Sequence, residues 1–264
     1  MDIYNYLILS LLGLFSGLLA GVLGIGGGIV LVPIIKAFGY SPVQAVATSS
    51  FAIIMTSTSG SWQNWRMGKL NFKQVFLLAL PSIFTAQIGA FLASYIAPYL
   101  LLGSFGLFLL LNILLSRMKK NVIVKKSLGN TEDSPINPLF ARIFTGGLTG
   151  LLAGLFGIGG GVILVPLQIR LLQTKIKAAI QISLGVIVIT SISACIQHAI
   201  QGNILFLEGF ILGLGGLVGA QISTRFLPRL SNKVVSFSFN LMLGILSVYI
   251  MYQAVISYQA SHSF

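Results

Sequence analysis

The chain has 264 residues, of which 56% are hydrophobic and only 8% charged. A soluble domain carries about 25% charged residues, so this composition excludes a soluble globular protein and indicates one that crosses a membrane several times. Sixteen Lys and Arg against four acids give a formal charge of +12. Because these bases lie in short segments between apolar runs, they fit membrane-orienting charges better than a nucleic-acid site. The single cysteine, Cys195, excludes an internal disulfide and a cysteine metal site.

A glycine-rich segment occurs twice. Residues 17–33 read GLLAGVLGIGGGIVLVP and residues 150–166 read GLLAGLFGIGGGVILVP, with thirteen of seventeen positions identical at an offset of 133. Glycine inside a helix is locally costly, because it loses more backbone entropy than any other residue. Two copies at one fixed spacing therefore predict two related halves, each built around a glycine break.

The first apolar run covers residues 3–38 and is too long for one span of about 20 residues, so the glycines divide it into two arms. A signal peptide is excluded because the run lacks a basic N-terminal region and its sequence recurs inside the chain. Further spans are predicted at 43–62, 75–97, 99–115, 178–200, 204–226 and 234–255, and a second divided run at 139–172. The predicted units are a first repeat (1–116), a basic cytoplasmic linker (117–138) and a second repeat (139–264).

Topology depends on whether each divided run crosses the membrane once or folds back as a hairpin. Single crossings give parallel halves and place seven of the sixteen basic residues outside. Hairpins give inverted halves with both termini outside, and Lys36 is then the one basic residue outside. The positive-inside rule favours an all-α polytopic membrane protein with two inverted repeats, each a glycine-broken helical hairpin plus three transmembrane helices. Bent backbone at membrane depth needs cover, so the two glycine tips are expected to meet inside the protein.

Each triple glycine precedes a short segment, 29–38 or 162–172, that is expected to be helical. A helix N-terminus presents unpaired N–H groups and the positive end of its dipole, and glycine allows a ligand to approach the backbone. We therefore expect a small anion to bind at the repeat interface, as in transporters with broken helices. The candidate residues are Gly26, Gly27, Gly28, Gly159, Gly160 and Gly161. The competing interpretation is that these glycines only allow close helix packing.

Polar side chains in matching places extend the candidate site. At the glycine offset, Ser50 corresponds to Ser183, and Ser57 corresponds to Thr190. For these hydroxyls, helix packing or bonding to backbone carbonyls is an equal alternative. The full polar set of substrate-binding candidates is Ser49, Ser50, Gln87, Gln181, Ser183 and Gln221.

Gln87 and Gln221 each stand in an Ala-Gln-Ile sequence, 134 residues apart. An amide inside the membrane needs a hydrogen-bond partner, so both are expected to face the bundle interior near the glycine tips.

The acidic residues are too few for cation chemistry. Of the four, only Glu208 could lie within a span, near its outer end, so no central carboxylate is available as a proton relay or cation ligand. We therefore predict no metal site and no cofactor. A membrane-embedded enzyme that uses His198 and Cys195 is a weaker alternative, because no carboxylate is placed to orient a base.

The doubled GxxAGxxGIGGGxxxVP pattern, the half-lengths and the basic central linker resemble the TauE/SafE sulfite exporter family of bacterial membrane permeases, over nearly the whole chain. The resemblance implies export of sulfur-containing anions such as sulfite, sulfoacetate or related organosulfonates. It also implies a multi-pass protein of the bacterial inner membrane. A permease for another small anion or metabolite, working outward or inward, stays open as an alternative. The expected partners are a small anion and the lipid bilayer, with no nucleic acid, and a homodimer is the default oligomer.

Overall fold

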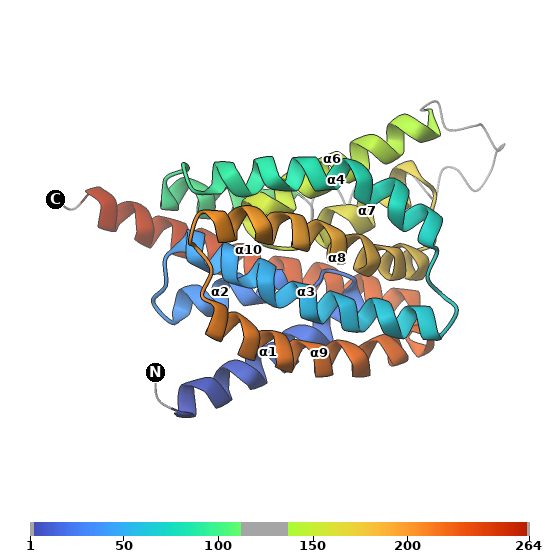
Figure 1. Ribbon diagram of the computed structural model, residues 1–264, viewed down its shortest axis with the longest axis horizontal. Coiled ribbons are helices and arrows are strands. Elements are labelled where there is room, and N and C mark those ends of the chain that lie inside the picture. Colours follow the sequence, from blue (N-terminus) through green and yellow to red (C-terminus); the bar gives the residue numbers. More distant parts are fainter. Residues whose placement is uncertain (1–2, 112–136, 263–264) are drawn as a thin grey trace.

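The structure is a computed structural model that describes residues 3–111 and 137–262, and these residues form a bundle of helices (Figure 1). In chain order the helices are α1 (Ile3–Leu23), α2 (Gly28–Ala37), α3 (Pro42–Arg66), α4 (Phe72–Ala93), an unlabelled helix at Pro98–Leu111, α6 (Pro138–Phe156), α7 (Gly161–Leu171), α8 (Ile176–Ile200), α9 (Phe206–Phe226), the 3-10 helix η1 (Leu227–Arg229) and α10 (Asn232–His262). The described residues contain no strand. The predicted linker lies outside them, except that Asn137 caps α6 and Pro138 begins it.

Within residues 3–111 and 137–262, six helices are long and apolar enough to cross a membrane: α1, α4, α6, α8, α9 and α10. This finding confirms the all-α, multi-pass class. The 25-residue helix α3 has the length of a span, but it carries many Ser, Thr, Gln and Asn side chains, most of them buried in the bundle. The helix at Pro98–Leu111 is shorter than a full span within the described residues. Three full spans in the first half therefore stay a prediction.

Local sequence signals explain where the longer helices begin. Ser41 and Gln44 form a reciprocal capping box in front of α3, with Pro42 as its first residue. The Asn71 side chain caps α4 by accepting a hydrogen bond from the Gln74 backbone N–H. The short helices α2 and α7 have no side-chain cap. The N–H groups of their first turns are therefore left for other partners.

The two halves match element by element, but with a change of offset. The short helix α7 has 11 residues where α2 has 10, so α3 and α8 begin at Pro42 and Ile176, an offset of 134 rather than 133. The predicted pairing of Ser50 with Ser183 is therefore wrong. The structural counterpart of Ser183 is Ser49.

The halves are interleaved rather than side by side. The most extensive helix packing joins α1 to α9 and α6 to α4, in each case a helix of one half against a helix of the other. A Cβ atom added to Gly17 of α1 would overlap the Gly216 backbone, and one added to Gly150 of α6 would overlap the Ser82 backbone. Small residues at four-residue spacing thus allow the backbones to touch, as is common between membrane helices.

Hydrogen bonds between connections identify the two ends of the bundle. At one end, the Tyr40 hydroxyl donates to Glu208 over 2.9 Å, which places the α2–α3 connection beside the start of α9. At the other, Lys177 Nζ donates to the Pro228 carbonyl over 2.9 Å, which places the start of α8 beside η1. The short helices α2 and α7 therefore lead to opposite ends of the bundle.

The end that contains η1 is called the basic end below. The described basic residues at this end are Arg66, Lys69, Lys73, Arg142, Arg170, Lys175, Lys177, Arg225, Arg229 and Lys233. Among residues 3–111 and 137–262, Lys36 is the one basic residue at the other end. Helix α3 ends at the basic end and α8 begins there, so these matched helices run in opposite directions (Figure 1). Their inverted arrangement across a membrane stays a prediction.

Candidate functional site

Each glycine break turns the chain sharply between two helices. Gly24, Gly26 and Gly27 have φ angles of +69°, +71° and +88°, and Gly157, Gly159 and Gly160 have nearly the same values. Only glycine adopts this left-handed conformation readily, so the pattern of the motif fixes the turn. The short helices begin directly after it, at Gly28 and Gly161, one residue earlier than the sequence predicted.

The two breaks touch each other in the interior. A Cβ atom on Gly28 would overlap the Gly157 carbonyl oxygen, and a Cβ atom on Gly161 would overlap the Gly24 carbonyl oxygen. All four glycines are buried. The uncapped N-terminus of each short helix thus lies against the break of the other half, and the predicted meeting of the tips is confirmed by these contacts.

A serine from each long helix ties the opposite break in place. Ser49 Oγ of α3 lies 2.7 Å from the Gly157 carbonyl oxygen, and Ser183 Oγ of α8 lies 2.6 Å from the Gly24 carbonyl oxygen. Each hydroxyl is also within hydrogen-bond distance of a carbonyl in its own helix. Ser49 and Ser183 therefore orient the breaks as donors to backbone carbonyls.

Two isoleucines occupy the space in front of the breaks. A Cβ atom on Gly26 would lie 2.9 Å from Ile187 and 3.0 Å from Ile53, and one on Gly159 would lie 2.8 Å from Ile187 and 3.2 Å from Ile53. Both isoleucine side chains are fully buried. Ile53 and Ile187 are equivalent positions of α3 and α8, so one apolar side chain from each half closes the glycine tips. We call this pair the isoleucine plug.

Gly27 and Gly160 have a different role from their neighbours. A Cβ atom on Gly27 would lie 2.5 Å from Ser16 Oγ, and one on Gly160 would overlap Thr149, in each case on the same hairpin. Ser16 also donates to the Gly27 carbonyl oxygen over 2.9 Å. These two glycines close their own hairpins, so a branched residue there would break the turn. Gly26, Gly28, Gly159 and Gly161 are the glycines that face the plug or the other break.

The remaining predicted site residues are not all brought to this place. Ser50 donates to the Val46 carbonyl of its own helix. Gln181 is buried on α8, next in sequence to Ile180, whose atoms contact Gly24.

The two predicted intramembrane amides lie elsewhere. Gln87 is exposed on the outer surface of α4. Gln221 is held between α3 and α9, where its Oε1 accepts from Ser59 over 3.0 Å and its Nε2 donates to Gln63 over 2.9 Å. The two glutamines differ because they lie on different faces of their helices: Gln221 faces α3, whereas Gln87 faces outward.

His198, in the last turn of α8, is buried within the bundle. Its Nε2 lies 3.2 Å from the Gly154 carbonyl oxygen of α6, which fixes the end of α8 against the second hairpin. Within the described residues, no three His, Cys, Asp or Glu side chains are grouped so as to hold a metal ion.

The isoleucine plug and the serine contacts to the opposite breaks were missed by sequence reasoning. Isoleucine in an apolar helix carries no signal of its own, and the pairing of Ser49 with Ser183 was obscured by the extra residue in α7. The equivalence of Ile53 and Ile187 at offset 134 was the one available clue.

The apolar helices and the paired breaks in the core define a multi-pass membrane transporter built from two interleaved halves. The chain belongs to the TauE/SafE sulfite exporter family, whose model matches residues 9–250.

Several curated proteins are similar in sequence to this chain over part or nearly all of its length. A probable membrane transporter protein of Methanocaldococcus jannaschii, MJ0441, is 31% identical over 79% of this chain and 76% of its own length. YunE, a probable membrane transporter protein of Bacillus subtilis, is 26% identical over 96% of this chain and its full length. Sulfite exporter TauE/SafE family protein 6 of Arabidopsis thaliana is 26% identical over 40% of this chain and 25% of its own length. No solved structure matches the chain.

Proposed function

We propose that the protein exports a small sulfur-containing anion, such as sulfite, sulfoacetate or a related organosulfonate, across the inner membrane of a bacterium. The observation that carries the proposal is the meeting of two uncapped helix N-termini, at Gly28 and Gly161, in a buried core. First-turn N–H groups and the positive ends of two helix dipoles attract an anion to one place. The sulfur chemistry of the substrate rests on the family to which the chain belongs.

The charges near the breaks agree with an anionic substrate. Glu208 is the one acidic side chain among residues 3–111 and 137–262, and it lies at the start of α9, bonded to Tyr40. Burial and the bond to Glu208 raise the pKa of Tyr40 to about 12, so its hydroxyl stays protonated and keeps donating to that carboxylate. The one carboxylate among the described residues thus lies at an end of the bundle, at the start of α9, and not at the glycine breaks.

Transport then requires the isoleucine plug to withdraw. Ile53 and Ile187 are buried and pack against Gly26 and Gly159, so on this proposal both side chains must move before an anion reaches the breaks. Because the two halves supply equivalent parts of the plug, a movement of either long helix would uncover the anion site on one side. The basic end faces the cytoplasm under the positive-inside rule, and a negative interior favours anion exit by about 2.3 kcal/mol per charge per 100 mV.

Flux through proteoliposomes tests this function. Purified protein is reconstituted, and efflux of labelled sulfite, sulfoacetate and a cation of similar size is followed at a defined membrane potential. We expect efflux of at least one sulfur anion above that of empty liposomes, faster at an inside-negative potential, and no cation flux. Flux of a different small anion alone would correct the substrate, and flux of the cation alone would overturn the proposal.

A further inference from the structure

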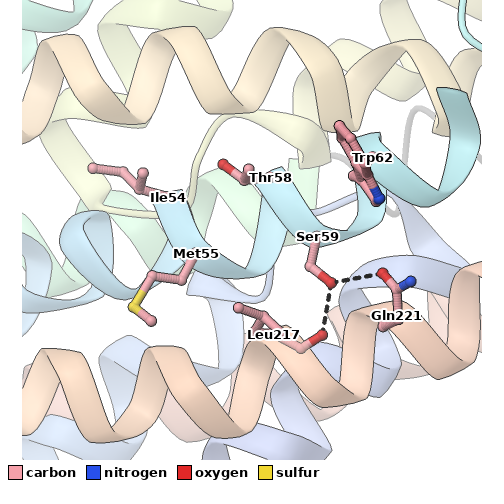
Figure 2. Close-up of a pocket in the computed structure, with 7 residues that line it drawn as sticks. All are labelled: Ile54, Met55, Thr58, Ser59, Trp62, Leu217 and Gln221. Carbon is pink, nitrogen blue, oxygen red and sulfur yellow. Dashed lines mark hydrogen bonds between the residues drawn. The ribbon is translucent and has the colours of Figure 1, made fainter.

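A groove opens on the outer side of the bundle, away from the glycine breaks. It lies between α3 and α9, has a volume of about 650 Å³, and is lined by Ile54, Met55, Thr58, Ser59, Trp62, Leu217 and Gln221 (Figure 2). Its walls are mainly apolar, and Trp62 at its rim has 53% of its surface exposed. In a membrane protein such a surface faces the acyl chains of the bilayer.

One end of the groove is polar and leads to a cation. Ser59 donates to Gln221, Gln221 donates to Gln63 Oε1, and Arg225 Nε donates to the same oxygen over 3.2 Å. Arg225 is exposed and lies one helical turn beyond Gln221, at the basic end. Gln63 thus holds the Nε of Arg225, and the guanidinium carries four further N–H donors on its two Nη groups.

The equivalent surface of the other half lacks this cation. There Ser193 Oγ lies 2.6 Å from the Ile83 carbonyl oxygen, as Ser59 Oγ lies 2.8 Å from the Leu217 carbonyl oxygen. The position equivalent to Arg225 is Phe91, whose ring packs on Tyr95. The helix packing is therefore similar on the two surfaces, but at this position α9 carries Arg225 whereas α4 carries Phe91.

We propose that this groove binds an anionic phospholipid of the leaflet at the basic end, with an acyl chain between α3 and α9 and the phosphate on Arg225. The apolar groove complements the acyl chain of such a lipid, and the guanidinium at its end complements the phosphate, because arginine binds phosphate through paired N–H donors. A free anion would bind the arginine but leave the apolar groove unoccupied. Between residues 217 and 225 the helix rises about 12 Å, enough to separate a headgroup from the middle of an acyl chain.

The test measures lipid binding by native mass spectrometry and thermal shift in neutral detergent. Phosphatidylglycerol is compared with phosphatidylcholine of the same acyl chains, for the parent and for Arg225→Phe, which introduces the residue of the other half. We expect phosphatidylglycerol to bind preferentially to the parent, and the variant to bind it about fivefold more weakly, as for about 1 kcal/mol per basic residue near a surface.

Arg229→Gln is the matched control, because it removes a charge from the same end without touching the groove. Its guanidinium lies over the Phe226 ring, 5.6 Å from the centroid. The control should retain the preference. An equal loss in both variants would show general surface charge, and competition by inorganic phosphate alone would show a soluble-anion site; either result overturns the proposal. If Arg225→Phe lowers the melting temperature without lipid, Arg225→Gln replaces it with the same expectation. Anion flux is not measured here, so failure of the transport proposal leaves this test unaffected.

Discussion

The isoleucine plug yields the most discriminating prediction, because its parts can be trimmed by one methyl group. Ile187→Val removes Cδ1, which would lie 2.9 Å from a Cβ atom on Gly161. Withdrawing the plug takes this buried methyl away from the breaks, and one buried methylene is worth about 0.8 kcal/mol. If withdrawal limits transport, the variant has a barrier lower by that amount and a flux about fourfold higher. The same change should reduce the free energy of unfolding by about 0.5–1.5 kcal/mol.

The matched control is Ile182→Val on the same helix. Ile182 is buried to a similar degree, but it belongs to a separate apolar cluster that includes Val75 and Leu78. Both variants are reconstituted, and sulfite efflux at fixed potential is measured beside thermal unfolding in detergent. We expect similar losses of stability and a faster flux only for Ile187→Val. Equal fluxes in the two variants would refute the role of the plug, as would a flux in Ile187→Val below that of the parent.

Three further outcomes follow from the packing. On a Cys195→Ser background, single cysteines in the described loops of the basic end should react with a membrane-impermeant reagent only from the cytoplasmic side; labelling from outside contradicts the inverted arrangement. Gly17→Ala should lower the melting temperature by several degrees, because its Cβ overlaps the α9 backbone, whereas Gly244→Ala, with nothing within 4 Å, should be neutral or stabilising. Ser183→Ala should lower the free energy of unfolding by about 1 kcal/mol and reduce flux. Gln87→Leu changes a side chain exposed on α4 and should leave flux unchanged. A loss of flux in Gln87→Leu but not in Ser183→Ala would place the transport site at the amide instead of at the breaks.

The sequence by itself determined the class of the protein and the position of its breaks. Both depend on local chemistry: apolar runs of sufficient length require a membrane, and consecutive glycines allow left-handed turns wherever they stand. The repeat of Gly26–Gly28 at Gly159–Gly161 also predicted that the two breaks belong together, because a bent backbone in a membrane must be covered by protein. The structure agrees on each of these points.

Only the tertiary structure decided which side chains stand in front of the breaks. One extra residue in α7 moved the equivalent of Ser183 from Ser50 to Ser49, and a shift of one residue turns a side chain by about 100° around a helix. The position of a residue around its helix also places the Gln87 side chain on the outer surface of α4 and the Ile187 side chain against Gly26 and Gly159. Residue type cannot reveal such placement, because it is set by the packing of α1 on α9 and of α6 on α4, helices that lie far apart in the chain.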